Sequence, residues 1–249
     1  NSPTYQSQYA TATRQQTSRS PEGRQTVTTF DALGRVVRKE RTGIDPISLS
    51  YNANGQLTTI GQGTAGNLRN ITLGYNPGGY VSSLTDPLSR VVSFEYDLAG
   101  RVTRQILPGG QEVLYGYDSN GNMASITPPI RPNHAFSYTP IDIVEEYTPP
   151  PAGPGTGPTT YTYNGDRQLI QVTRPDGRTI ALAYDTGGRL SSQTIQRGLT
   201  GYTYNAQTGN LTSITAPDGG LLSYTYDGSL VTGTVWQGVV QGSLGLTYD

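Results

Sequence analysis

The stretches YDLAGRV, at residues 96–102, and YDTGGRL, at residues 184–190, decide how this sequence folds. Each joins an aromatic residue and an acid to a turn that ends in Gly-Arg, and then to an apolar residue. An aromatic residue followed by Asp or Asn recurs about every 21 residues in both directions. The anchors are Phe30, Tyr51, Tyr75, Tyr96, Tyr117, a degraded copy at Tyr138, Tyr163, Tyr184, Tyr204, Tyr226 and Tyr248. This phase predicts a single array of about eleven repeats over residues 1–249.

A second large apolar residue stands two positions before most anchors, as Leu49 does before Tyr51 and Tyr224 before Tyr226. Residues two apart share one face of a β-strand. Each repeat is therefore expected to present a paired aromatic or aliphatic stripe on one face. Most of the 18 tyrosines occupy these two positions, so the same face should carry the apolar contacts of the fold.

Two turn signals alternate along each repeat. The Asp or Asn after the anchor can accept a backbone hydrogen bond two residues on, and the following Gly supplies a positive φ. A second signal lies between anchors, for example PGG at residues 108–110 and PDG at residues 217–219. The repeat thus predicts two antiparallel strands and two turns, and an all-β fold built as a curved, spiralling sheet. Apolar pairs three apart, such as Leu57 with Ile60, break strict alternation and predict a β-bulge or a partly buried second face.

The segment 139–160 interrupts the pattern. It holds six prolines, most of them between residues 149 and 158, and lengthens its repeat to 25 residues. Because proline donates no ladder hydrogen bond, this insertion is not expected to join a central strand. It is interpreted as a surface loop of polyproline character, or alternatively as a docking site for a partner.

Composition excludes several classes of partner. The net charge is −1, charged residues make up 14 % of the chain, and no basic run could neutralise a row of phosphates, so nucleic acid is not expected. No apolar stretch approaches the roughly 20 residues that span a bilayer. The chain has no cysteine, so neither disulfides nor thiolate-bound metals are expected. These features fit an exported bacterial protein, secreted or at the cell surface.

The sequence predicts no catalytic, cofactor or metal site. His134 is the single histidine, which makes a zinc site or a catalytic triad improbable. Glu145 and Glu146 are adjacent, and both are expected to lie in a solvent-exposed loop. Residues 118–122 alternate oxygen-bearing side chains like a calcium loop, but Pro129 stands where such a loop needs a glutamate, so the segment is read as a turn. The repeated aspartates have a structural interpretation, and the chain is not expected to be an enzyme.

The two quoted stretches resemble the signature of the YD-repeat, or RHS-repeat, family, which includes bacterial RHS proteins, insecticidal toxin complexes and teneurins. The resemblance implies a long β-sheet that spirals into a hollow shell. In toxin-bearing members the shell holds a C-terminal effector, which aspartyl self-cleavage releases; in teneurins it belongs to an adhesion ectodomain. This chain lacks the Asp-Pro-x-Gly-Leu core motif, with DPL at residues 86–88 as the nearest match. Self-cleavage is therefore assigned to no residue here, and the chain is expected to be a fragment of a longer one.

Two functional hypotheses follow. The first is a structural segment of a shell, whose partners are other repeats and an encapsulated effector. The alternative is an extracellular interaction module: a self-assembling filament formed through open strand edges, an adhesin, or a binder of surface glycans, with Trp236 or Tyr147 as the exposed aromatic residues. An enzyme is the third choice, and its candidate residues would be His134 and Glu146.

Overall fold

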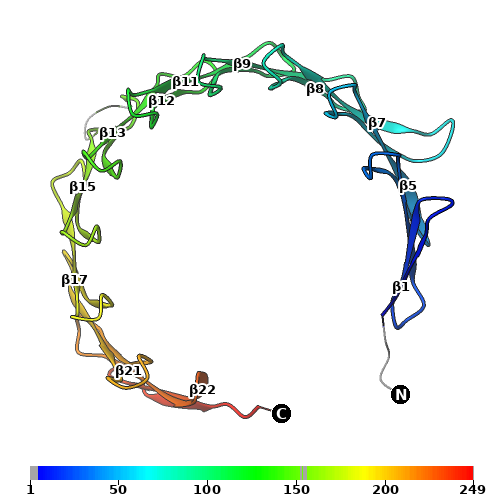
Figure 1. Ribbon diagram of the computed structural model, residues 1–249. Coiled ribbons are helices and arrows are strands. Elements are labelled where there is room, and N and C mark those ends of the chain that lie inside the picture. The colour runs from blue at the N-terminus through cyan, green and yellow to red at the C-terminus, as the bar shows by residue number, and fades with distance from the viewer. Residues whose placement is uncertain (1–4, 152, 154–155, 249) are drawn as a thin grey trace. The chain divides into compact units, whose positions relative to one another are not determined.

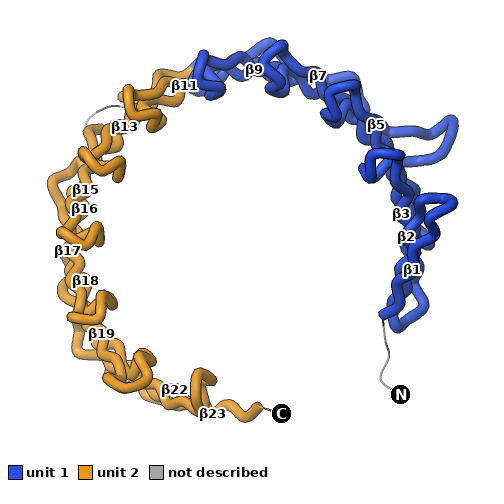
Figure 2. Tube along the Cα trace, in the orientation of Figure 1, with its two compact units in different colours: residues 1–115, 128–130 blue, residues 116–127, 131–249 orange. Residues whose placement is uncertain are grey.

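The computed structural model describes residues 5–151, 153 and 156–248. Its 23 strands are antiparallel and belong to one open sheet, and the described residues contain no helix. The prediction of an all-β hairpin array is therefore confirmed. Two compact units divide the chain: unit 1 covers residues 1–115 and 128–130, and unit 2 covers residues 116–127 and 131–249 (Figure 2).

The strands of unit 1 are β1 (Gln6–Ala10), β2 (Gln15–Arg19), β3 (Gln25–Phe30), β4 (Val36–Arg41), β5 (Ile44–Tyr51), β6 (Leu57–Gln62), β7 (Arg69–Tyr75), β8 (Val81–Thr85), β9 (Val91–Tyr96), β10 (Val102–Ile106) and most of β11 (Glu112–Tyr117). Unit 2 contains β12 (Met123–Thr127), β13 (His134–Tyr138), β14 (Val144–Thr148), β15 (Thr159–Tyr163), β16 (Leu169–Thr173), β17 (Thr179–Tyr184), β18 (Leu190–Ile195), β19 (Gly198–Tyr204), β20 (Leu211–Thr215), β21 (Leu221–Asp227), β22 (Leu230–Gln237) and β23 (Gly242–Gly245). In each unit, strands that follow one another in the chain pair side by side, as a run of hairpins.

One kind of turn occurs at both edges of the sheet. At the anchor edge the Asp31 N–H donates to the carbonyl of Arg35 (2.9 Å), and Gly34 N–H donates back to the carbonyl of Asp31 (3.2 Å). At the opposite edge Arg174 and Arg178 are joined in the same way, with Gly177 at the position of Gly34. Both glycines have φ = +77°. This is a type I turn closed by a left-handed residue, a common three-residue hairpin loop.

A β-bulge follows most anchors and explains the apolar pairs three apart. Tyr51 lies opposite Leu57, whereas the preceding Ser50 lies opposite Thr59, so one extra residue is inserted on β6. The shift puts Leu57 and Ile60 on the same face as Tyr51. The same irregularity recurs at the other anchors of the paired strands described above, for example where Tyr204 meets Leu211. Of the two expected explanations, the bulge is the one found.

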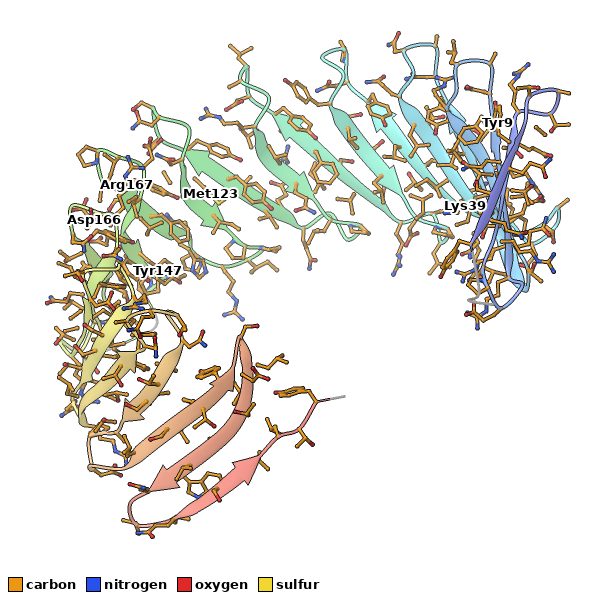
Figure 3. The ribbon with its side chains drawn as sticks, turned by 60° about the horizontal axis from the view of Figure 1, so that its bottom comes forward. Tyr9, Lys39, Met123, Tyr147, Asp166 and Arg167 are labelled. Atoms are coloured by element: carbon orange, nitrogen blue, oxygen red, sulfur yellow. The ribbon has the colours of Figure 1, made fainter. Side chains whose placement is uncertain are left out.

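The two faces of the sheet differ in chemistry. One, here called the tyrosine face, carries the anchors, the large residues two positions before them and their cross-strand partners. The other is rich in small and hydroxyl side chains, as in the pairs Ser50–Thr59, Ala183–Ser192 and Thr203–Ser213. Within each unit the strands form a single curved layer, with side chains leaving both faces (Figures 1 and 3). Accordingly, no apolar side chain among the described residues is fully buried, and the tyrosine face is half-exposed.

The loop in the proline-rich segment, residues 139–160, is shorter than predicted, because part of the segment forms a strand. β14 lies inside residues 139–160 and pairs with β13 on one side and β15 on the other. The expectation that this segment stays out of the sheet was wrong for β14, because its residues, Val144–Thr148, contain no proline. The described part of the remaining loop, residues 149–151, 153 and 156–158, lies outside the strands. Residues 152, 154 and 155 of the proline-rich run, and Asp249 of the last anchor pair, lie outside the described residues.

Candidate functional site

The geometry that recurs along this chain is a contact between successive repeats, and it starts in the turn after the anchor. In unit 2 the Oδ1 atom of Asp185 accepts hydrogen bonds from the backbone N–H groups of Gly187 and Arg189, both at 2.9 Å. Its Oδ2 atom accepts the Nε–H of Arg189 at 2.8 Å. A single carboxylate thus closes the turn and fixes the direction of the arginine, because charge-assisted bonds from a planar guanidinium are directional.

The arginine then reaches the anchor of the next repeat. The guanidinium carbon of Arg189 lies 4.6 Å from the centre of the Tyr204 ring, a cation–π contact. The hydroxyl of Tyr204 in turn donates to the carbonyl of Leu190, at 2.9 Å. The contacts form a circuit from Asp185 to Arg189, to Tyr204 and back to the residue after Arg189. This circuit, here called the clamp, fastens one hairpin to the next.

The clamp repeats in unit 1 with the same geometry. Asp31 holds Arg35 through Oδ1 and Oδ2, the guanidinium of Arg35 lies 4.5 Å from the centre of the Tyr51 ring, and the Tyr51 hydroxyl donates to the carbonyl of Val36 at 2.9 Å. The tyrosine part of the clamp is the most widespread. Hydroxyl-to-carbonyl bonds of this kind are made by Tyr51, Tyr75, Tyr96, Tyr138, Tyr163, Tyr184, Tyr204, Tyr226 and Tyr248.

A neutral version of the clamp replaces Asp-Arg by Asn-Gln. Asn164 closes its turn through Oδ1, and its side-chain N–H₂ donates to Oε1 of Gln168 at 2.9 Å. The amide of Gln168 then donates to the carbonyl of Gly188 in the next anchor turn, also at 2.9 Å. Asn52 and Gln56 do the same in unit 1, with Gly79 as acceptor. Each version bridges neighbouring repeats through a side chain at the exit of the turn.

The clamp lowers the pKa values of its carboxylates. The pKa of Asp185 is held below its ordinary value by the side-chain hydrogen bond from Arg189 and then by that residue's backbone N–H. For Asp31 and Asp97 the largest cause is the backbone hydrogen bond at the turn exit, from Arg35 and Arg101 respectively. These carboxylates are therefore charged under ordinary conditions. Their pKa shifts have the opposite direction to that of a general acid, whose pKa is raised toward neutrality.

The candidate residues for catalysis or glycan binding contact neighbouring side chains of the sheet. His134 lies on β13 with Nδ1 2.7 Å from the hydroxyl of Tyr147, and the two rings stack. The Tyr147 ring also stacks on Phe136, so this tyrosine is half-buried. Oε1 of Glu146 accepts a hydrogen bond from the Thr148 hydroxyl, and Glu146 lies opposite Ser137 in the ladder. Trp236 is 36 % exposed and lies across the ladder from Gly242.

The part of the chain that the structure describes holds no group of three or more His, Cys, Asp or Glu side chains placed to bind a metal ion. In the same residues no helix is long and apolar enough to cross a membrane. The clamp is not among the features predicted from the sequence. The sequence carries a signal for it, because the residue four positions after the turn Asp or Asn often matches it: Arg follows Asp at Asp31 and Asp185, and Gln follows Asn at Asn52 and Asn164.

The fold and the clamp together define a tandem β-hairpin repeat protein whose successive hairpins are fastened by anchor tyrosines. The chain belongs to the teneurin YD-shell family, which matches residues 1–249. A curated relative, the double-stranded DNA deaminase toxin A of Burkholderia cenocepacia (strain H111), is 28 % identical over 155 residues, which are 62 % of this chain and 10 % of the toxin.

Solved structures share the fold. The TcdB2-TccC3-Cdc42 crystal structure superposes with a TM-score of 0.55 at 14 % identity, over 93 % of this chain and 16 % of that one. The Tc holotoxin pore of Photorhabdus luminescens, carrying the TccC3-D651A mutation, gives 0.50 at 16 % identity, over 85 % of this chain and 15 % of its own. This chain thus spans a tenth to a sixth of the length of these relatives. Family and fold support a structural role in a shell.

Proposed function

We propose that this chain is a stretch of wall in a larger secreted or cell-surface protein, and that the wall encloses a C-terminal effector. The clamp is the observation that carries the proposal. Its tyrosine hydroxyl bonds, made at nine anchors, join successive hairpins at the sheet edge and help to hold together a layer without a buried core. A wall made of a single β-sheet needs such fastening, because without a second layer it gains little stability from apolar burial.

The different chemistry of the two faces supports the same role. Antiparallel sheets commonly turn one face to water and the other to apolar material. Here the face rich in serine, threonine and alanine suits water, and the half-exposed tyrosine face suits a polypeptide held beside it. In this proposal the segment performs no catalysis itself. Any enzymatic activity of the kind that the name of the deaminase toxin indicates would reside in another part of the parent chain.

The test uses the native polypeptide that contains this segment. Its intact mass should be much larger than the 26.7 kDa of these 249 residues, and its mapped termini should show a correspondingly longer chain. Limited proteolysis should then leave the C-terminal region uncut while the shell is folded, and cut it rapidly once denaturant opens the wall. A native chain of about this mass, or a C-terminal region cleaved equally fast in both states, would refute encapsulation.

A second candidate function is self-assembly through strand edges. Among the described strands, β1 and β23 each pair on one side alone, with β2 and β22 respectively. Open edges can recruit a further strand. If encapsulation fails, sedimentation of the 249-residue chain should show concentration-dependent assembly that a Gln8→Pro substitution in β1 abolishes. Monomeric behaviour at all concentrations would exclude this alternative.

A further inference from the structure

A cavity in unit 2 brings three arginines together at the sheet edge opposite the clamps. Its volume is about 550 Å³, and it is lined by Arg174, Arg178, Thr179, Ile180, Ile195, Gln196 and Arg197. Arg174 and Arg178 belong to the turn between β16 and β17, and Arg197 belongs to the turn between β18 and β19. The lining contains no acidic residue.

The floor of this cavity belongs to the tyrosine face. Ile180 pairs with Val172, which in turn pairs with Tyr161, so all three lie on that face. Ile195 is 39 % exposed. The cavity therefore combines a cationic rim with an apolar floor that stays in contact with water.

The positive charge at the rim is poorly balanced within the chain. Nε of Arg178 lies 3.6 Å from Oδ2 of Asp176, and a guanidinium nitrogen of Arg197 lies 3.7 Å from Oδ2 of Asp218. Both distances exceed a normal hydrogen bond, and all four side chains are largely exposed. Arg174 has no ion pair among the described residues. Two carboxylates, each in a long and exposed ion pair, thus face three guanidinium groups.

The turn itself does not require these arginines. Arg174 and Arg178 stand directly opposite each other, joined by a backbone bond of 2.9 Å, and like charges at such positions are destabilising. The equivalent turn between β20 and β21 has Ala216 and Gly220 at these positions with the same backbone bonds. The backbone of this turn therefore does not need arginine at either position.

We propose that this cavity binds an acidic polypeptide segment, with carboxylates held by Arg174, Arg178 and Arg197 and an apolar side chain resting on Ile180 and Ile195. Planar guanidinium groups suit carboxylates through paired hydrogen bonds. A free oxyanion would leave the isoleucine floor wet, whereas a peptide that alternates acidic and apolar residues covers rim and floor together. This assignment does not depend on encapsulation.

The experiment measures the fluorescence anisotropy of a labelled octapeptide of alternating Glu and Leu, titrated with the 249-residue chain. A peptide with Gln in place of Glu is the charge control. The Glu peptide should bind at least tenfold more tightly, and added salt should weaken it. Arg174→Gln with Arg197→Gln should weaken binding about tenfold or more, and Ile195→Ser severalfold. The matched control Arg69→Gln, an exposed arginine at the start of β7 in unit 1, should leave binding unchanged.

Other results would overturn the proposal. Equal binding of the Glu and Gln peptides would remove the role of charge, and an equal loss in Arg69→Gln would show nonspecific attraction. If inorganic phosphate displaced the peptide with an inhibition constant equal to the peptide's dissociation constant, the cavity would be a site for small oxyanions. Arginine-dependent binding to phosphatidylserine vesicles without peptide binding would assign the rim to a membrane surface. Circular dichroism of each variant establishes that its sheet is intact, so a loss of binding is not a loss of fold.

Discussion

Replacing Tyr204 by Phe removes one hydroxyl group and leaves the ring beneath Arg189. The lost bond, from this hydroxyl to the carbonyl of Leu190 at 2.9 Å, is the part of the clamp that most anchors share. A net protein hydrogen bond is worth roughly 0.5–1.5 kcal/mol, and water can reach a half-buried carbonyl, so Tyr204→Phe should destabilise the fold by about 1 kcal/mol. This corresponds to a roughly fivefold larger population of the locally open state.

The assay must resolve local stability, because repeat arrays open in parts rather than all at once. Native-state hydrogen exchange on β18 and β19 should show the loss near residue 190, with smaller changes in distant hairpins. The matched control is Tyr9→Phe. The Tyr9 side chain is 53 % exposed and contacts Phe30 through its ring, so the control should stay within about 0.5 kcal/mol of the parent.

A second substitution separates the ring from the hydroxyl. Tyr204→Leu also removes the contact with Arg189, and a double-mutant cycle with Arg189→Gln should give a coupling energy of about 0.5–1 kcal/mol, as expected for an exposed cation–π pair. If the amides of β18 and β19 are as well protected from exchange in Tyr204→Phe as in Tyr9→Phe, the hydroxyl bond does not fasten the repeats. A coupling energy of zero would likewise remove Arg189 from the clamp.

Three further predictions concern the turns. Gly34 has φ = +77° and no atom within contact of an added Cβ, so Gly34→Ala should cost about 1–2 kcal/mol through backbone strain alone, measured by thermal unfolding; no change would contradict the left-handed turn. Because the pKa of Asp185 is lowered from its ordinary value of 3.8, its contribution is fully present above pH 3.8 and is lost as the pH falls through the lower folded pKa. The acid unfolding curve of Asp185→Asn should therefore be flatter than that of the parent, and parallel curves would refute this. Arg189→Gln should destabilise unit 2, and adding Asp185→Asn should restore part of the loss by recreating the pair found at Asn164 and Gln168; a doubly weakened variant would show that the two clamps are not interchangeable.

Local sequence patterns predicted most of the fold. The spacing of anchors predicted the hairpins, the Gly positions predicted the turns, and the spacing of Leu57 and Ile60 correctly raised a bulge. These features depend on a few adjacent residues, since strand alternation and turn φ values are set by near neighbours. The proline-rich segment was the exception. Its prolines hid the short strand Val144–Thr148, which pairs because its own five residues keep their N–H groups free for the ladder.

By itself, the sequence determined that this protein is a tandem β-hairpin array with tyrosine anchors on one face. The tertiary structure decided what those anchors do. Tyr204 and Leu190 are 14 residues apart, and whether a hydroxyl meets a carbonyl across such a separation depends on the register of two paired hairpins. The same holds for Arg174, Arg178 and Arg197, which the sequence scatters over two turns. Register brings distant side chains together, and it is a property of the whole sheet rather than of any one repeat.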